Sequence, residues 1–137
     1  MDTTVELKPV SPAALAAYRK HKTRIVENVV ARALEQPAEV AQHGDDAERI
    51  VTAGIEFTAQ VLESVIQVGD PALLDYQLSW AQDRLPHDGV SPAFVLNRFR
   101  NFAESVAEML APAHAQEVNQ WVNWLINRQQ ALVNAAA

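Results

Sequence analysis

Apolar residues recur at helical spacing in separate segments of this chain, and Pro and Gly stand between the segments. The first segment opens at Ser11-Pro12, a preferred helix start because the serine oxygen caps a free backbone N–H group and proline suits the first turn. Its apolar positions are Leu15, Tyr18, Ile25, Val26, Val29, Val30, Ala33 and Leu34. This spacing predicts a helix that Pro37 ends.

Four further helices are predicted in the same way. They open near Gly44, at Gly69-Asp70-Pro71, at Ser91-Pro92 and at Pro112, and Pro86 ends one of them. A Gly stops one helix, and an Asp followed by Pro starts the next. No segment alternates apolar and polar residues over the length of a strand. We therefore predict an all-α fold, a bundle of five to six helices.

Two features of these helices each have two interpretations. Lys20, Lys22 and Arg24 around His21 indicate either the solvated face of one helix or a bend between two shorter helices. The last helix reaches Asn134 and three alanines with no Gly stop. It is therefore either a connector to something further along or a frayed terminus.

Length and composition favour a single domain over residues 1–137, with an N-terminal arm over 1–10 and a last helix over 112–134. Hydrophobic residues make up 49% of the chain, enough for a packed core. The net charge of −6 disfavours nucleic acid as a partner, because such binding depends on Lys and Arg. With no apolar run of about 20 residues and no signal peptide, we expect a cytoplasmic protein that does not contact membranes.

Little in the sequence indicates catalysis or metal binding. The chain has no Cys, which excludes disulfides and thiolate metal sites. Its four His, at positions 21, 43, 87 and 114, form no i,i+4 pair on one helix. Arg98 and Arg100, with Arg84 nearby, are able to bind an anion, but surface ion pairs are the ordinary interpretation. We expect neither an enzyme nor a metal site.

Large aromatic residues lie in the middle of the predicted helices. They are Phe57, Trp80, Phe94, Phe99, Phe102, Trp121 and Trp124. They predict either a plain core or a cleft for an apolar ligand. In the last helix, Trp124 and Ile126 widen the apolar face beyond one stripe, which favours a partner chain and hence a homodimer. The residues expected at this interface, with help from the first helix, are Trp121, Trp124, Leu125 and Leu132.

The helix order and two local motifs resemble a globin. Gly54 lies inside a helix, where it costs about 1 kcal/mol relative to Ala, and it matches the glycine beside the distal haem pocket that lets two helices cross closely. Residues 85–94, LPHDGVSPAF, resemble the junction after the proximal helix of sensor globins. The resemblance implies Ala53 at the distal position and Arg84 or Leu85 at the proximal one. Neither position is a His.

A globin fold without a proximal His resembles the N-terminal sensor domain of RsbR-type stressosome proteins. The shared elements are Gly69-Asp70-Pro71, Arg84 with Gly89-Val90-Ser91, and the helix from Val95 to Leu110; the resemblance spans residues 12–134. It implies a globin-like bundle without haem or another cofactor, a homodimer, and a signal passed to a sulfate-transporter/anti-sigma-antagonist (STAS) domain or a kinase. The ligand-pocket candidates are Ala53, Gly54, Phe57, Val61, Trp80, Arg84, Phe99 and Phe102.

Two other functions stay open beside the haem-free sensor. One is a haem-binding oxygen sensor with His87 as the axial ligand, although His87 comes two or three residues too late. The other is the helical part of a cobalamin-binding regulator; Trp80 fits it, but no Glu/Asp-x-His follows on the same helix. Because Arg stays protonated and Leu has no lone pair, we expect no stoichiometric haem. The side chains expected to fill the space that haem takes in a globin are Phe57, Trp80, Phe99 and Phe102.

Overall fold

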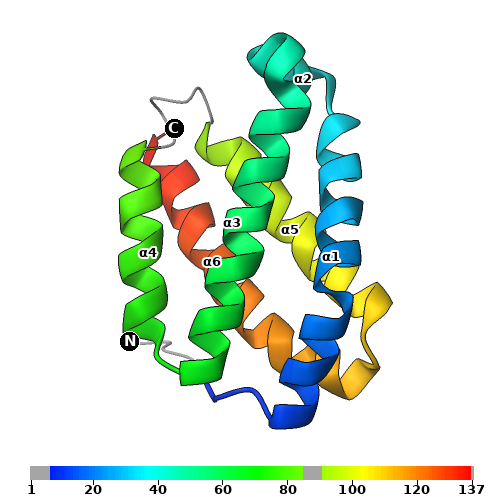
Figure 1. Ribbon diagram of the computed structural model, residues 1–137. Helices are drawn as coiled ribbons and strands as arrows, with labels where there is room; N and C mark the ends of the chain where they lie inside the picture. Colours follow the sequence, from blue (N-terminus) through cyan, green and yellow to red (C-terminus); the bar gives the residue numbers. More distant parts are fainter. Residues whose placement is uncertain (1–6, 85–90, 137) are drawn as a thin grey trace.

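The computed structural model describes residues 7–84 and 91–136, with the side chains of residues 7–79 and 91–135. In these residues the chain forms an all-α bundle with no strand (Figure 1). The elements are α1 (Pro12–Leu34), α2 (Pro37–His43), the 3-10 turn η1 (Gly44–Asp46), α3 (Ala47–Val68), α4 (Pro71–Arg84), α5 (Pro92–Met109) and α6 (Pro112–Ala136). The all-α prediction is confirmed, and the helix count agrees with five to six.

Serine caps and a glycine set the helix ends at the places that the sequence predicted. The Ser11 side chain accepts a hydrogen bond from the Ala14 N–H at the start of α1. The Ser91 side chain does the same for the Phe94 N–H at the start of α5. Gly69 ends α3 with φ at 78°, in the left-handed region where other residues are strained.

The structure departs from the predicted helix boundaries in three places. Pro37 does more than end α1: it begins α2, a helix of seven residues, because proline suits a first turn as well as it stops a helix. Gly44–Asp46 forms η1, and α3 begins only at Ala47. α1 runs unbroken through residues 20–24. The interpretation of a bend between two shorter helices is therefore wrong, and the basic residues lie on one helix. The predicted stop at Pro86 lies outside the described residues.

The helices pack around one core. α1 lies against α3, α5 and α6, α5 lies against α6, and α4 lies at the edge of the bundle beside α3 (Figure 1). α1 and α3 run antiparallel. The largest fully buried side chains include Trp121, Tyr18, Phe102, Ile25, Ile55 and Leu62. No described helix combines the length and the apolar character that crossing a membrane requires.

Two polar groups of the core bind backbone oxygens. The Tyr18 hydroxyl donates to the Ala59 carbonyl at 2.8 Å and so joins α1 to α3. Nε1 of Trp121 donates to the Lys8 carbonyl at 3.0 Å. Burial, with a smaller contribution from Glu63, raises the pKa of Tyr18 well above its ordinary value. The phenol therefore stays protonated and keeps its role as a donor.

Candidate functional site

Four of the predicted pocket residues lie on α3, and none of them is fully buried. Ala53 is exposed, and Phe57 keeps 37% of its surface exposed. Gly54 and Val61 are half-buried. At 100° per residue, Ala53 and Phe57 each lie about 200° around the helix from Ile55, which is buried. The expectation that Phe57 fills the core is therefore wrong.

Two predicted pocket residues on α5 belong to the core. Phe99 is 4% exposed and Phe102 is 1% exposed. The ring of Phe102 lies beside that of Tyr18, with their centroids 6.5 Å apart. The other candidate positions lie outside the described residues: the side chains of Trp80 and Arg84, and the whole of Leu85 and His87.

A buried ion pair joins α2 to α5, and the sequence pattern gave no sign of it. Arg98, on α5, is 6% exposed, and Glu39, on α2, is 1% exposed. Nε of Arg98 donates to Oε1 of Glu39 at 2.7 Å, and Nη2 donates to the same oxygen. The expectation that Arg98 forms an ion pair on the surface is wrong. Arg98 follows Val95 by three residues and therefore lies within the buried stripe of α5.

Gly54 provides the space for this ion pair. A Cβ atom on Gly54 would lie 2.9 Å from Nη1 of Arg98, which is too close for a normal contact. The guanidinium group therefore lies against the backbone of α3. The close approach that the sequence indicated at Gly54 is present, but a side chain of α5 makes it and not a crossing helix.

Two buried polar atoms of α2 have no hydrogen-bond partner among the residues that the structure describes. They are Oε2 of Glu39 and Nε2 of His43. His43 lies one turn after Glu39, and its ring centroid is 6.4 Å from that of Phe94, which lies one turn before Arg98. α2 therefore faces α5 at two successive levels. We call Glu39, His43, Gly54 and Arg98 the Arg98 cluster.

The chemistry of the Arg98 cluster suits binding and positioning. Desolvation offsets much of the attraction within a buried ion pair, whereas removal of one partner costs about 3–5 kcal/mol. The pair therefore holds α2 against α5, and loss of either charged group would weaken this contact. Within the described parts of the chain, no group of three or more His, Asp or Glu residues is placed to hold a metal ion.

Hydrogen bonds from side chains of α6 to the backbone of α5 connect these two helices. Nε2 of Gln129, a residue that is 7% exposed, donates to the Pro92 carbonyl at 3.0 Å. Nδ2 of Asn119 donates to the Ala103 carbonyl at 3.0 Å. The helix that carries Arg98 is thus fixed to α6 at its start and again past its middle.

The predicted dimer residues of α6 are divided between core and surface. Trp121 is 0% exposed and Leu125 is 2% exposed. Neither can lie at a dimer interface, and that part of the prediction is wrong. Trp124 and Leu132 are half-buried. The broad apolar face of α6 is largely covered within the chain, because α6 packs against both α5 and α1.

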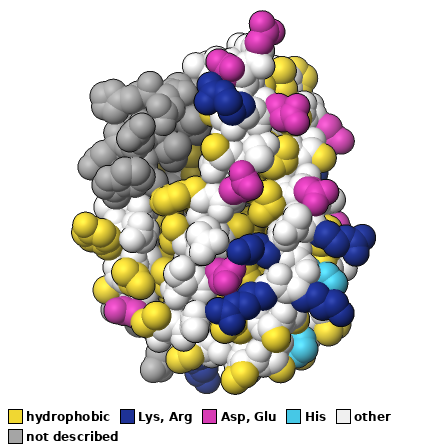
Figure 2. All heavy atoms as spheres, in the orientation of Figure 1, with side chains coloured by type: hydrophobic (Ala, Val, Ile, Leu, Met, Phe, Trp, Pro, Cys, Tyr) yellow, Lys and Arg dark blue, Asp and Glu magenta, His cyan; other side chains and the backbone are white. Residues whose placement is uncertain are grey.

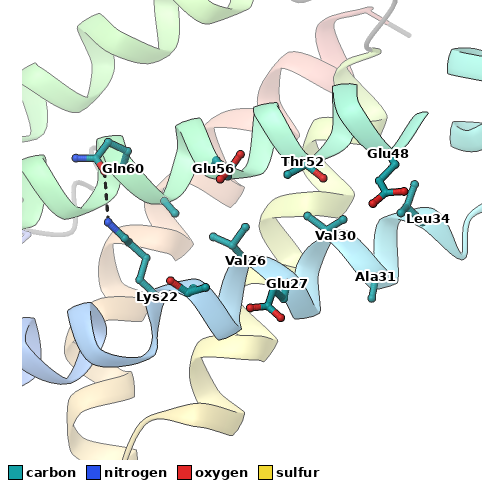
Figure 3. A pocket seen from close by; sticks show the side chains of 12 residues that line it. Lys22, Val26, Glu27, Val30, Ala31, Leu34, Glu48, Thr52, Glu56 and Gln60 are labelled. Atoms are coloured by element: carbon teal, nitrogen blue, oxygen red, sulfur yellow. Dashed lines mark hydrogen bonds between the residues drawn. The ribbon is translucent and has the colours of Figure 1, made fainter. Parts of the chain in front are cut away.

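A groove of about 530 Å³ lies on the surface between α1 and α3 (Figure 3). Val26, Val30 and Leu34 of α1 contribute apolar side chains to it, and Glu48 and Glu56 line it from α3. The sequence did not predict this groove, because its existence depends on how two distant helices pack together.

Comparison with known proteins assigns no family to the chain. No protein-family model matches it, and a search of the curated proteins finds no match. The resemblance to the RsbR-type sensor domain therefore stays a prediction that rests on the sequence motifs.

Proposed function

We propose that this chain is a non-enzymatic, haem-free, globin-like sensor domain of the RsbR type, which acts as a cytoplasmic homodimer. The observation that carries the proposal is the position of Arg98. Its guanidinium group lies against Gly54, which the resemblance to globins places beside the distal haem pocket. The buried, charged Arg98 side chain takes up space beside that pocket, which supports a haem-free domain.

The Arg98 cluster is the proposed input of the sensor. Oε1 of Glu39 accepts both hydrogen bonds from Arg98, while Oε2 has no partner in the described parts of the chain. Oε2 is buried in this arrangement, so a ligand or partner that donates to it needs α2 to move. Such a ligand shifts the balance between two arrangements of α2 and α5 by as much as its affinity differs between them.

The proposed output is α6. Gln129 and Asn119 hold α6 to the backbone of α5, and a close-packed core passes a displacement of one helix to its neighbour. A movement of α5 therefore changes the position of α6. The receiver that this proposal implies is a STAS-type or kinase domain, in the same chain or in another.

Titration with haemin tests the haem-free part of the proposal. Purified protein should give only the broad absorption of loosely bound haemin, as should the His87→Ala variant. A sharp Soret band at one haem per chain that disappears in His87→Ala would support the haem-binding oxygen sensor instead.

A further inference from the structure

The surface that α1 and α3 form together has its charges separated along its length. Lys20 and Arg24 are exposed near the middle of α1. Glu27 is exposed farther along α1, and Glu48 and Glu56 are exposed on α3. Figure 2 shows this face, with most Lys and Arg side chains in its lower part and most acidic side chains in its upper part.

These five charged side chains have no ion-pair partner within the described residues. The ion pairs found there involve other side chains. The apolar side chains of the groove, such as Val26 and Val30, are half-buried and lie beside Glu27 (Figure 3). The face therefore combines an apolar strip with unpaired charges of both signs.

The order of charges along α1 is complementary to itself in the antiparallel direction. At 100° per residue, Lys20, Arg24, Glu27 and Ala31 fall within about 60° of one another on the helix. Along this stripe the side chains are basic, basic, acidic and small. A second α1 helix laid antiparallel on the stripe places its basic part over the acidic part of the first.

We propose that a second copy of this chain docks on this surface, with the two α1 helices antiparallel about a twofold axis between Arg24 and Glu27. A twofold interface is self-complementary, so each contact occurs twice. Arg24 of each copy faces the partner's Glu27, and Lys20 points toward the acidic start of the partner's α3. The inference rests on the proposed homodimer and deepens it by naming its surface.

Charge pairing across this interface makes self-association sensitive to salt. The net charge of −6 opposes association, but at physiological ionic strength such repulsion is screened beyond about 8 Å. Complementary charges at contact distance favour association and the correct register. The dimer should therefore weaken as salt is raised, whereas an apolar dimer through Trp124 and Leu132 should not.

Sedimentation velocity at tens of micromolar protein tests the surface with two charge reversals, Arg24→Glu and Glu27→Arg. In a homodimer of the first variant, both contacts join two acidic side chains. In a homodimer of the second, both contacts join two basic side chains. Each variant alone should weaken the dimer more than about tenfold and move toward 15.1 kDa.

An equimolar mixture of the two variants should restore the dimer. The chain with Arg24→Glu is acidic at both contact positions, and the chain with Glu27→Arg is basic at both. Each of the two contacts in the heterodimer therefore joins opposite charges, and the mixture should return to twice the mass of either variant alone. Circular dichroism should show unchanged helix content in both variants, because both positions are exposed.

Two matched controls separate this surface from other causes. Arg100→Glu reverses an exposed charge on α5 and should leave the dimer intact. Loss of the dimer only in Trp124→Ala/Leu132→Ala would place the interface on α6, so the homodimer would stand and this surface would be wrong. A wild-type monomer, dimeric single variants or a monomeric mixture would each overturn the inference. A wild-type monomer would also contradict the proposed homodimer, whereas the other results leave it standing. The haemin titration tests the haem-free part of the proposed function separately.

Discussion

Because Gly54 has no side chain, Arg98 has room to reach Glu39. Alanine is a better helix residue than glycine by about 1 kcal/mol, so Gly54→Ala would stabilise a helix with free space beside it. Here the new methyl group would lie 2.9 Å from Nη1 of Arg98. Because Glu39 holds that guanidinium group in a buried position, the side chain cannot move aside without weakening the ion pair.

We predict that Gly54→Ala lowers the free energy of unfolding by about 1–2 kcal/mol, measured by urea denaturation. In an Arg98→Ala background the contact is gone, and the same substitution should instead stabilise the protein by up to about 1 kcal/mol. An equal destabilisation in both backgrounds would show that Arg98 is not the cause.

Single residues of the candidate site differ in how much the sequence reveals about them. A glycine inside a helix signals a close approach, and this signal identifies Gly54. The sequence predicts a surface position for Arg98, because an arginine within an apolar stripe is usually exposed, and its burial depends on Glu39. Glu39 gives no signal, since nothing in the sequence shows that a lone acid on a short helix faces an arginine 59 residues later.

Among the helices, the start of α1 is fixed more firmly than the start of α5, although both begin with Ser-Pro. Each serine caps its own helix. The Ser11 N–H and hydroxyl also donate to the two carboxylate oxygens of Glu117 on α6, at 2.9 and 3.0 Å. The cap of α1 is therefore also a tertiary contact.

We predict that Ser11→Ala costs about 2 kcal/mol of unfolding free energy, whereas Ser91→Ala costs about 1 kcal/mol. The first substitution removes a cap and a hydrogen bond to a charged group, and the second removes only a cap. Thermal or urea unfolding of both variants provides the comparison. Equal losses would mean that the contact with Glu117 adds nothing.

Electrostatic contacts between α1 and α3 predict a dependence of stability on pH. Lys22 and Arg19 contact Glu63 at 2.6 and 3.0 Å. The hydrogen bond from Lys22 is the largest cause that lowers the pKa of Glu63 from its ordinary 4.5. A lowered pKa in the folded state stabilises the protein above the unfolded value, and this contribution disappears as the pH falls through the folded value.

We predict that Glu63→Gln lowers the unfolding free energy at neutral pH by about 1 kcal/mol or less, because the contact is partly exposed to solvent. The difference between variant and wild type should shrink as the pH falls below 4.5. Urea unfolding over a pH series measures it. A difference that stays constant down to acid pH would rule out this linkage.

For the molecule as a whole, the sequence predicts where the helices lie along the chain better than it predicts which helices pack against one another. Serine, proline and glycine act locally, so most helix starts are predicted, and the short α2 and the turn η1 are missed. The sequence does not show how many helices of the same chain surround α6. Its broad apolar face therefore suggested a partner chain, although α5 and α1 cover much of it. Trp121 and Leu125 are buried against their own chain, and the groove between α1 and α3 exists only once both helices are packed.

The central claim at this scale is that the Arg98 cluster is coupled to α6. A change at Arg98 should reach α6 through α5, because Gln129 binds the backbone at the start of the helix that carries Arg98. Any core substitution lowers global stability, so a matched control is needed. Val106→Ala provides this control, because Val106 is a fully buried residue of the same helix and lies outside the Arg98 cluster.

Hydrogen exchange of backbone amides, followed by mass spectrometry, tests this coupling most directly. At equal global stability, set with urea, Arg98→Met should accelerate exchange in α2 and in α6 around Gln129 more than Val106→Ala does, because local openings report local contacts. If the additional exchange in Arg98→Met stops at α2 and α5 and leaves α6 the same as in Val106→Ala, the proposed path from the Arg98 cluster to α6 is contradicted.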